Sequence, residues 1–166
     1  RGAPWKIYHN TVVYDGTYHS IGANIALWGA RNSTGVPHEV YNNVFVNIGG
    51  GYFLSGLDTE IESQRYDGNL YWRASGARGG FAFRLKDDSA TRHFDTLREW
   101  QRSSAQRRVA NRAGTGWEIG GVEADPRLGR GFRPAAGSAA ASGAVVARGL
   151  PRRTSPSPRG KESGKP

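Results

Sequence analysis

The sequence contains no cysteine and no methionine, and no apolar run reaches the roughly 18 residues that a membrane-spanning helix needs. Without cysteine, neither a disulfide nor a cysteine-ligated zinc site can form. No basic segment followed by an apolar one, the pattern of a secretory signal peptide, is visible at Arg1. Because the initiator methionine is missing and residues 1–6 run directly into a strand-like segment, we expect the chain to be a fragment or a processed piece, with further structural repeats upstream.

The composition favours short strands joined by turns, because 24 of the 166 residues are glycine and 11% are aromatic. The formal net charge is +9, but much of it lies in the last 15 residues. The basic residues of this tail are Arg152, Arg153, Arg159, Lys161 and Lys165. A binder of nucleic acid needs its positive charge on the folded part, so nucleic acid ranks last among the expected partners.

Three segments of the chain align around an asparagine, at residues 7–13, 40–46 and 66–72. Their asparagines, Asn10, Asn43 and Asn69, are 33 and 26 residues apart. In each segment an apolar or aromatic residue lies three positions before the asparagine and another lies two positions after it. This pattern predicts a ladder in which the three asparagine side chains stack at equivalent turns.

The repeat predicts a solenoid, because one such unit cannot bury its apolar face without its neighbours. A β-sandwich or meander whose turns contain asparagine is the alternative. Equivalent repeat positions define an expected core of Ile7, Val12, Ile25, Val40, Phe45, Phe53, Tyr71 and Phe83.

The repeats resemble those of right-handed parallel β-helix proteins of the pectate-lyase-like superfamily. Residues 94–100 are similar to a short helix that often follows the last coils of that family, and residues 123–128 to its late "DP-x-F/L" strand. Residues 132–144 resemble the closing motif "F-x-L-x-x-x-S-P-A-I-D-A-G", with Ala139 and Ser142 replacing its proline and aspartate. The resemblance implies an all-β fold, a right-handed parallel β-helix fragment with a short C-terminal helix and an irregular cap.

This interpretation divides the chain into four parts. We expect parallel coils over residues 1–90, a helical insertion over 91–113 and a terminal coil with its cap over 114–149. Residues 150–166, rich in Pro, Ser, Arg, Lys and Gly, are expected to be a disordered basic tail. Asp95 or Thr96 is expected to cap the helix, with Leu97, Trp100 and Ala105 near its buried face.

The most suggestive polar pattern is the alternation of Asp58, Glu60 and Glu62, followed by Arg65. In an extended strand these carboxylates share a face about 7 Å apart, and they repel one another unless a cation or an arginine lies near. Such a row is suited to bind Ca²⁺ or to supply the acid and base of glycoside hydrolysis. A solvated acidic loop between coils is the alternative.

Other residues suit a saccharide ligand. Trp28 and Arg31, on the preceding repeat, are candidate neighbours of the carboxylate row in a substrate-binding groove. A lyase needs a cationic side chain that neutralises the carboxylate of a uronate, and arginine binds carboxylates in a bidentate manner. The candidates for this role are Arg31, Arg65, Arg73, Arg84 and Lys86. Ordinary surface charge is the alternative for each. Outward-facing Trp28, Tyr52 or Trp72 could stack on sugar rings, whereas Tyr71 aligns with core positions.

The resemblance implies a carbohydrate-active protein, secreted or at the cell surface. A polysaccharide lyase or glycoside hydrolase acting on an acidic polysaccharide is the leading expectation, with its catalytic residues unassigned. A non-catalytic surface or glycan-binding protein is the alternative, since a fold does not fix a function.

Overall fold

A computed structural model describes residues 5–15, 23–27, 37–56, 64–77, 79–85, 88–111 and 114–142. The strands of the first half are β1 (Lys6–Tyr8), β2 (Thr11–Tyr14), β3 (Ala23–Leu27), β4 (Glu39–Tyr41), β5 (Val44–Asn47) and β6 (Tyr52–Gly56). Those of the second half are β7 (Arg65–Asp67), β8 (Leu70–Arg73), β9 (Phe81–Phe83), β10 (Arg92–Phe94), β11 (Ala110–Asn111), β12 (Gly114–Thr115) and β13 (Val122–Glu123). The helices are α1 (Leu97–Arg102), α2 (Ala139–Ser142) and two 3₁₀ turns, Ser104–Arg108 and Arg130–Phe132.

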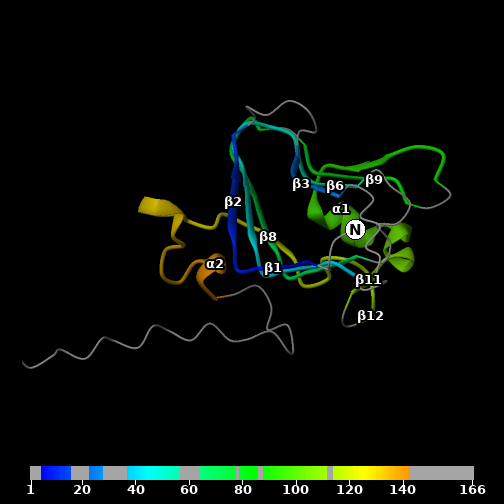
Figure 1. Cartoon of the computed structure of the whole chain (residues 1–166). Coiled ribbons are helices and arrows are strands. Elements are labelled where there is room, and N and C mark those ends of the chain that lie inside the picture. The colour runs from blue at the N-terminus through cyan, green and yellow to red at the C-terminus, as the bar shows by residue number, and fades with distance from the viewer. Residues whose placement is uncertain are drawn as a thin grey trace, which may run out of the picture.

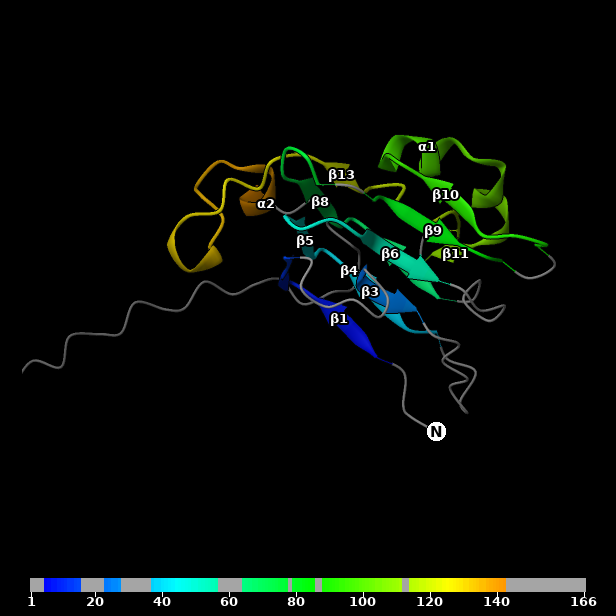
Figure 2. The ribbon, with the colours of Figure 1, turned by 90° about the horizontal axis from the view of Figure 1, so that it is seen from above.

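The first nine strands fall into three sheets that the chain visits in turn. One sheet has the order β1-β4-β7, a second has the order β2-β5-β8-β13 and a third has the order β3-β6-β9-β10. All pairs among the first nine strands are parallel, and equivalent repeat positions lie in register, as Val12 with Phe45 and Phe45 with Tyr71. The sheets surround a common interior, with β1 and β3 at one end of the stack and α1 with β10 at the other (Figures 1 and 2).

The expectation of an all-β, right-handed parallel β-helix is wrong. The described residues form a mixed structure of parallel sheets, a two-stranded antiparallel sheet (β11-β12) and two short α-helices. The regular succession of strands ends at β9, because β10 runs back antiparallel to it and leads into α1. The segment that resembles the closing motif of that family contains α2 (Ala139–Ser142). Three of its four residues are alanine, which has a high helix propensity.

The core follows the alternation of side chains along the strands. Phe45 and Tyr71 point into the common interior and their rings stack at 5.4 Å between centroids. The buried interior residues include Val40, Phe45, Phe53, Tyr71 and Phe83 of the expected core, whereas Ile7 and Val12 are only half-buried. The side chain of Ile25 lies outside the described residues.

We predict that Phe45→Ala lowers the free energy of unfolding by about 3–5 kcal/mol, because the side chain is fully buried against other aromatic rings. Chemical denaturation measures this change. Phe132→Ala, at a residue that is 60% exposed, provides a matched control and should cost less than about 1 kcal/mol. A cost for Phe45→Ala as small as that of the control would contradict its place in the core.

Helix α1 closes one end of the interior, and its predicted cap is confirmed. The Thr96 hydroxyl accepts from the Glu99 backbone N–H, and the Glu99 carboxylate accepts from the Thr96 N–H. Leu97, Trp100 and Ala105 are buried as expected. The helix therefore covers the aromatic core at the end of the stack opposite to β1.

Candidate functional site

A directional row of hydrogen bonds joins the three repeat asparagines at one corner of the sheets. The side-chain oxygen of Asn43 accepts from the backbone N–H and from the side-chain NH₂ of Asn10, at 3.0 and 3.1 Å. The side-chain oxygen of Asn69 accepts from the same two groups of Asn43, each at 2.9 Å. The structure thus brings these three sequence-predicted residues together.

A carboxylate occupies the next position of this row. Glu118 accepts from the Asn69 backbone N–H at 3.1 Å, from the Asn69 side-chain NH₂ and from the Tyr71 hydroxyl at 2.8 Å. Its backbone has a positive φ of 57°, and its side chain is fully buried. The row therefore ends on an acid enclosed in the core.

Burial raises the pKa of Glu118 to about 7, although the hydrogen bonds from Asn69 and Tyr71 act in the opposite direction. The nearby Asp67 carboxylate adds to the increase. Burial and the charge of Glu118 likewise raise the pKa of Tyr71 well above its usual value. A carboxyl group with such a pKa is suited to acid–base chemistry, but Glu118 has no exposed surface at which a substrate could meet it.

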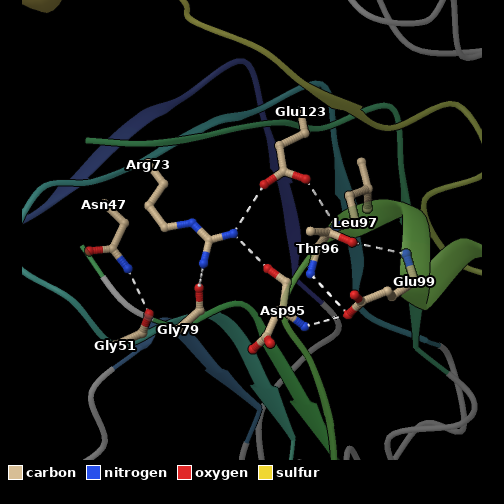
Figure 3. A network of polar contacts seen from close by, with 9 residues as sticks. All are labelled: Asn47, Gly51, Arg73, Gly79, Asp95, Thr96, Leu97, Glu99 and Glu123. Carbon is tan, nitrogen blue, oxygen red and sulfur yellow. Dashed lines mark hydrogen bonds and ion pairs between the residues drawn. The ribbon is translucent and has the colours of Figure 1, made fainter. Parts of the chain in front are cut away.

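A second polar network connects the sheets to α1 (Figure 3). The Arg73 guanidinium donates to the carbonyl oxygens of Gly79 and Asp95, the latter at 2.5 Å, and forms an ion pair with Glu123 at 3.2 Å. The other oxygen of Glu123 accepts from the backbone N–H of Leu97, at the start of the helix. Arg73 is therefore committed to structural partners and is not free to bind a uronate.

The outer face of the β2-β5-β8-β13 sheet carries a groove. Residues 125–140 cross this face, and α2 lies outside the wall formed by β2 and β8 (Figure 1). Between this segment and the strands a cavity of about 380 Å³ remains, open on one side. Its lining is mainly apolar and comprises Val13, Val46, Ile48, Trp72, Asp125, Pro126, Arg127, Leu128, Gly129 and Phe132.

One wall of the groove is a compact turn with three arginines. The backbone N–H of Ala135 donates to the carbonyl oxygen of Arg127, and that of Gly129 to Arg133, which closes the turn on itself. Arg127, Arg130 and Arg133 are exposed, and none of them forms an ion pair with another described residue. The turn thus concentrates positive charge, and one of its arginines, Arg127, lines the groove together with Trp72 and Phe132.

Most of the candidate residues predicted from the sequence lie outside the described residues. These are Trp28, Arg31, Asp58, Glu60 and Glu62. Arg65 is described: it lies in β7 and pairs with Glu39 of the neighbouring strand at 3.4 Å. The carboxylate row and its groove with Trp28 and Arg31 therefore stay predictions, as does Ca²⁺ binding.

The described residues include no group of three or more Asp, Glu or His side chains placed to hold a metal ion. None of the helices in this part of the chain has the length and apolar character that crossing a bilayer requires.

Comparison of the chain with known protein families, curated proteins and solved structures found no match. The resemblance to the pectate-lyase-like superfamily thus stays a prediction.

Neither Glu118 nor the arginine turn was predicted from the sequence. Glu118 was hidden because its segment, Trp-Glu-Ile-Gly-Gly, lacks the asparagine that marks the other rows. The threefold spacing of Arg127, Arg130 and Arg133 was a usable signal, since it predicts charges on one side of a turn. Trp72 was among the residues named as possible sugar platforms, and the structure places it in the groove.

Proposed function

We propose that the described part of the chain binds an acidic polysaccharide in the groove on the outer face of the β2-β5-β8-β13 sheet. The observation that carries the proposal is the Trp72 ring in a half-open apolar groove that Arg127 also lines. Arg130 and Arg133 are exposed in the same turn. Binding sites for small ligands are typically concave and mainly apolar, with a few polar groups that fix orientation.

The two kinds of lining residue suit the two faces of a uronic acid. The apolar face of a sugar ring can pack on Trp72, and Phe132 at the rim is 60% exposed and available for a neighbouring ring. The carboxylates of successive sugars can pair with Arg127, Arg130 or Arg133, because the guanidinium matches a carboxylate in a bidentate manner. The Asp125 carboxylate, which accepts from the Arg127 N–H at 2.7 Å, offers an acceptor for sugar hydroxyls.

This proposal favours binding over cleavage. Of the residues named for lyase or hydrolase chemistry, Arg65 and Arg73 have structural partners. The groove is lined by a single carboxylate, Asp125, whereas glycoside hydrolysis uses two. The lyase or hydrolase stays the alternative, and it depends on the row of Asp58, Glu60 and Glu62.

We predict that Trp72→Ala weakens the binding of hexagalacturonate roughly tenfold, as measured by isothermal titration calorimetry, because the stacking surface is lost. Trp5→Ala is the matched control, since Trp5 is 66% exposed and does not line the groove. Circular dichroism shows whether both variants keep the wild-type fold. Equal affinity of the two variants for the hexasaccharide would contradict the proposal.

The charge requirement is tested by a second pair of variants. Arg130→Ala combined with Arg133→Ala should weaken hexagalacturonate binding at low salt, and less so at high salt. Arg98→Ala combined with Arg102→Ala, at exposed positions of α1, makes the same change in net charge elsewhere. Neutral cellohexaose should bind more weakly than hexagalacturonate. Tighter binding of a single-stranded oligothymidylate, which could also stack on Trp72, would favour nucleic acid instead.

A further inference from the structure

The arginine turn contains two residues in the left-handed backbone region, Arg127 with a φ of 48° and Phe132 with a φ of 57°. Glycine adopts this conformation without steric cost, whereas a residue with a Cβ atom is strained in it. A bulky aromatic residue such as Phe132 is rarely found there. Glycine occurs in the same turn at Gly129 and Gly131, but neither strained position carries it.

The hydrogen bonds of the turn hold both residues in this conformation. The backbone N–H of Arg127 donates to the Asp125 carboxylate at 2.7 Å, and its carbonyl oxygen accepts from the Ala135 N–H at 2.9 Å. The backbone N–H of Phe132 donates to the carbonyl oxygen of Gly129 at 3.1 Å. The turn thus fixes the direction in which each side chain leaves the backbone, which lowers the entropic cost of binding a ligand.

The other non-glycine residues with a positive φ have a structural explanation. Within the described part of the chain they are His9, Asn42 and Glu118. His9 and Asn42 each immediately precede an asparagine of the row, as Gly68 does with a φ of 66°, and Glu118 ends the row. Left-handed backbone is therefore part of the corner at which the repeats turn. The two strained residues of the arginine turn lie elsewhere, and the corner does not account for them.

Packing does not account for them either. Phe132 is 60% exposed and belongs to neither of the apolar clusters formed by the described residues. Arg127 is exposed and forms no ion pair with another described residue. What the two side chains share is the groove, which both of them line. Backbone strain that persists without a structural reason points to a function.

We infer that Arg127 and Phe132 determine the specificity of the groove: Arg127 selects the carboxylate of a uronate, and Phe132 packs on the ring of a neighbouring sugar. The inference rests on the binding proposed above. Of the three arginines of the turn, Arg127 alone lines the groove, where its guanidinium can pair with a carboxylate in a bidentate manner. Arg130 and Arg133 add attraction that salt screens.

Glycine at either strained position separates this role from a structural one. Arg127→Gly and Phe132→Gly remove the side chain and the backbone strain together, so neither should lower the urea concentration at the midpoint of unfolding. His9→Gly is the matched control, because it removes the same kind of strain at an exposed residue that does not line the groove.

Isothermal titration calorimetry with hexagalacturonate measures the effect on binding. Arg127→Gly and Phe132→Gly should each weaken binding about tenfold, whereas His9→Gly should bind as the wild type does. Arg127→Gly should also reduce the dependence of the affinity on salt concentration, because an ion pair is lost. Phe132→Gly should keep the salt dependence of the wild type, because the ring carries no charge.

The inference and the proposed binding fail in different ways. Absence of saturable hexagalacturonate binding to the wild-type protein would overturn both. Binding that Trp72→Ala weakens, but that Arg127→Gly or Phe132→Gly leaves unchanged, would overturn this inference and leave the proposed binding in place. A lower midpoint of unfolding in either glycine variant would assign the strained residue a structural role instead. An equal loss of affinity in His9→Gly would likewise contradict a role specific to the groove.

Discussion

Asn69→Leu is expected to lower the free energy of unfolding by roughly 3–6 kcal/mol, because the substitution removes the middle of a buried hydrogen-bonded row. The Asn69 side chain accepts from both donors of Asn43 and donates to the carbonyl oxygen of Val40 and to Glu118. Leucine has a similar volume but no polar atom. The Asn43 backbone N–H would remain buried without an acceptor, at about 1–3 kcal/mol for each such group.

Asn10→Leu provides the matched control, since it makes the same chemical change at the exposed end of the row. Its donors point to Asn43 and Tyr8, and water can replace the lost partners there. We expect a cost below about 1 kcal/mol. Urea denaturation of both variants measures their free energies of unfolding. If Asn10→Leu and Asn69→Leu lowered this free energy equally, the buried hydrogen bonds of Asn69 would contribute no more to stability than the exposed ones of Asn10.

The sequence was sufficient to predict this row but not the class of the fold. The aligned asparagines and their flanking apolar residues specify which residues share a corner, because the pattern recurs at three positions at once. The helix cap at Thr96 was also predictable, since capping depends on residues four positions apart or fewer. The antiparallel return of β10 depends instead on contacts between distant segments, which no local pattern encodes.

The groove was only partly predictable for a similar reason. Alternation along β8 assigns Trp72 to the face opposite Tyr71. Which segment covers that outer face is decided by the path of residues 125–140, and this path depends on packing against Val44, Val46 and Leu70. Glu118 was not predictable, because a glutamate in a short segment is normally solvated and only the fold encloses it.

The free energy of unfolding of the wild-type protein is expected to decrease between acidic and mildly alkaline pH. The substitution Glu118→Gln is expected to abolish this decrease. In the folded chain the pKa of Glu118 is about 7, above its usual value of 4.5. The folded state therefore binds more protons than the unfolded state between these two values, and the free energy of unfolding falls as the pH rises. This contribution is fully present below pH 4.5 and is lost as the pH rises through 7, a change of about 3 kcal/mol.

Glutamine removes the charge but keeps only part of this hydrogen bonding. The Asn69 backbone N–H donates to one oxygen of Glu118, and the Asn69 NH₂ and the Tyr71 hydroxyl donate to the other. A glutamine oxygen at the second position can accept from the Asn69 NH₂ and from Tyr71, but its NH₂ then faces the Asn69 N–H, which costs about 1–3 kcal/mol. We therefore expect the variant to be less stable than the wild type at pH 5 and to keep the same stability up to pH 8. Urea denaturation across this range measures both profiles.

The pKa values of Tyr66 and Tyr71 are raised, as that of Glu118 is, but their contributions are lost only above the usual tyrosine value of 10.0. His38 differs from Glu118 in the sign of its effect. The Nδ1 atom of His38 accepts from the Trp5 N–H at 2.8 Å, and burial lowers the pKa of His38. Its contribution is lost as the pH falls, which is the opposite direction. Asp95→Asn, at an exposed carboxylate, is the control and should keep the wild-type profile. A Glu118→Gln profile as steep as that of the wild type would show that the buried carboxyl is not the titrating group.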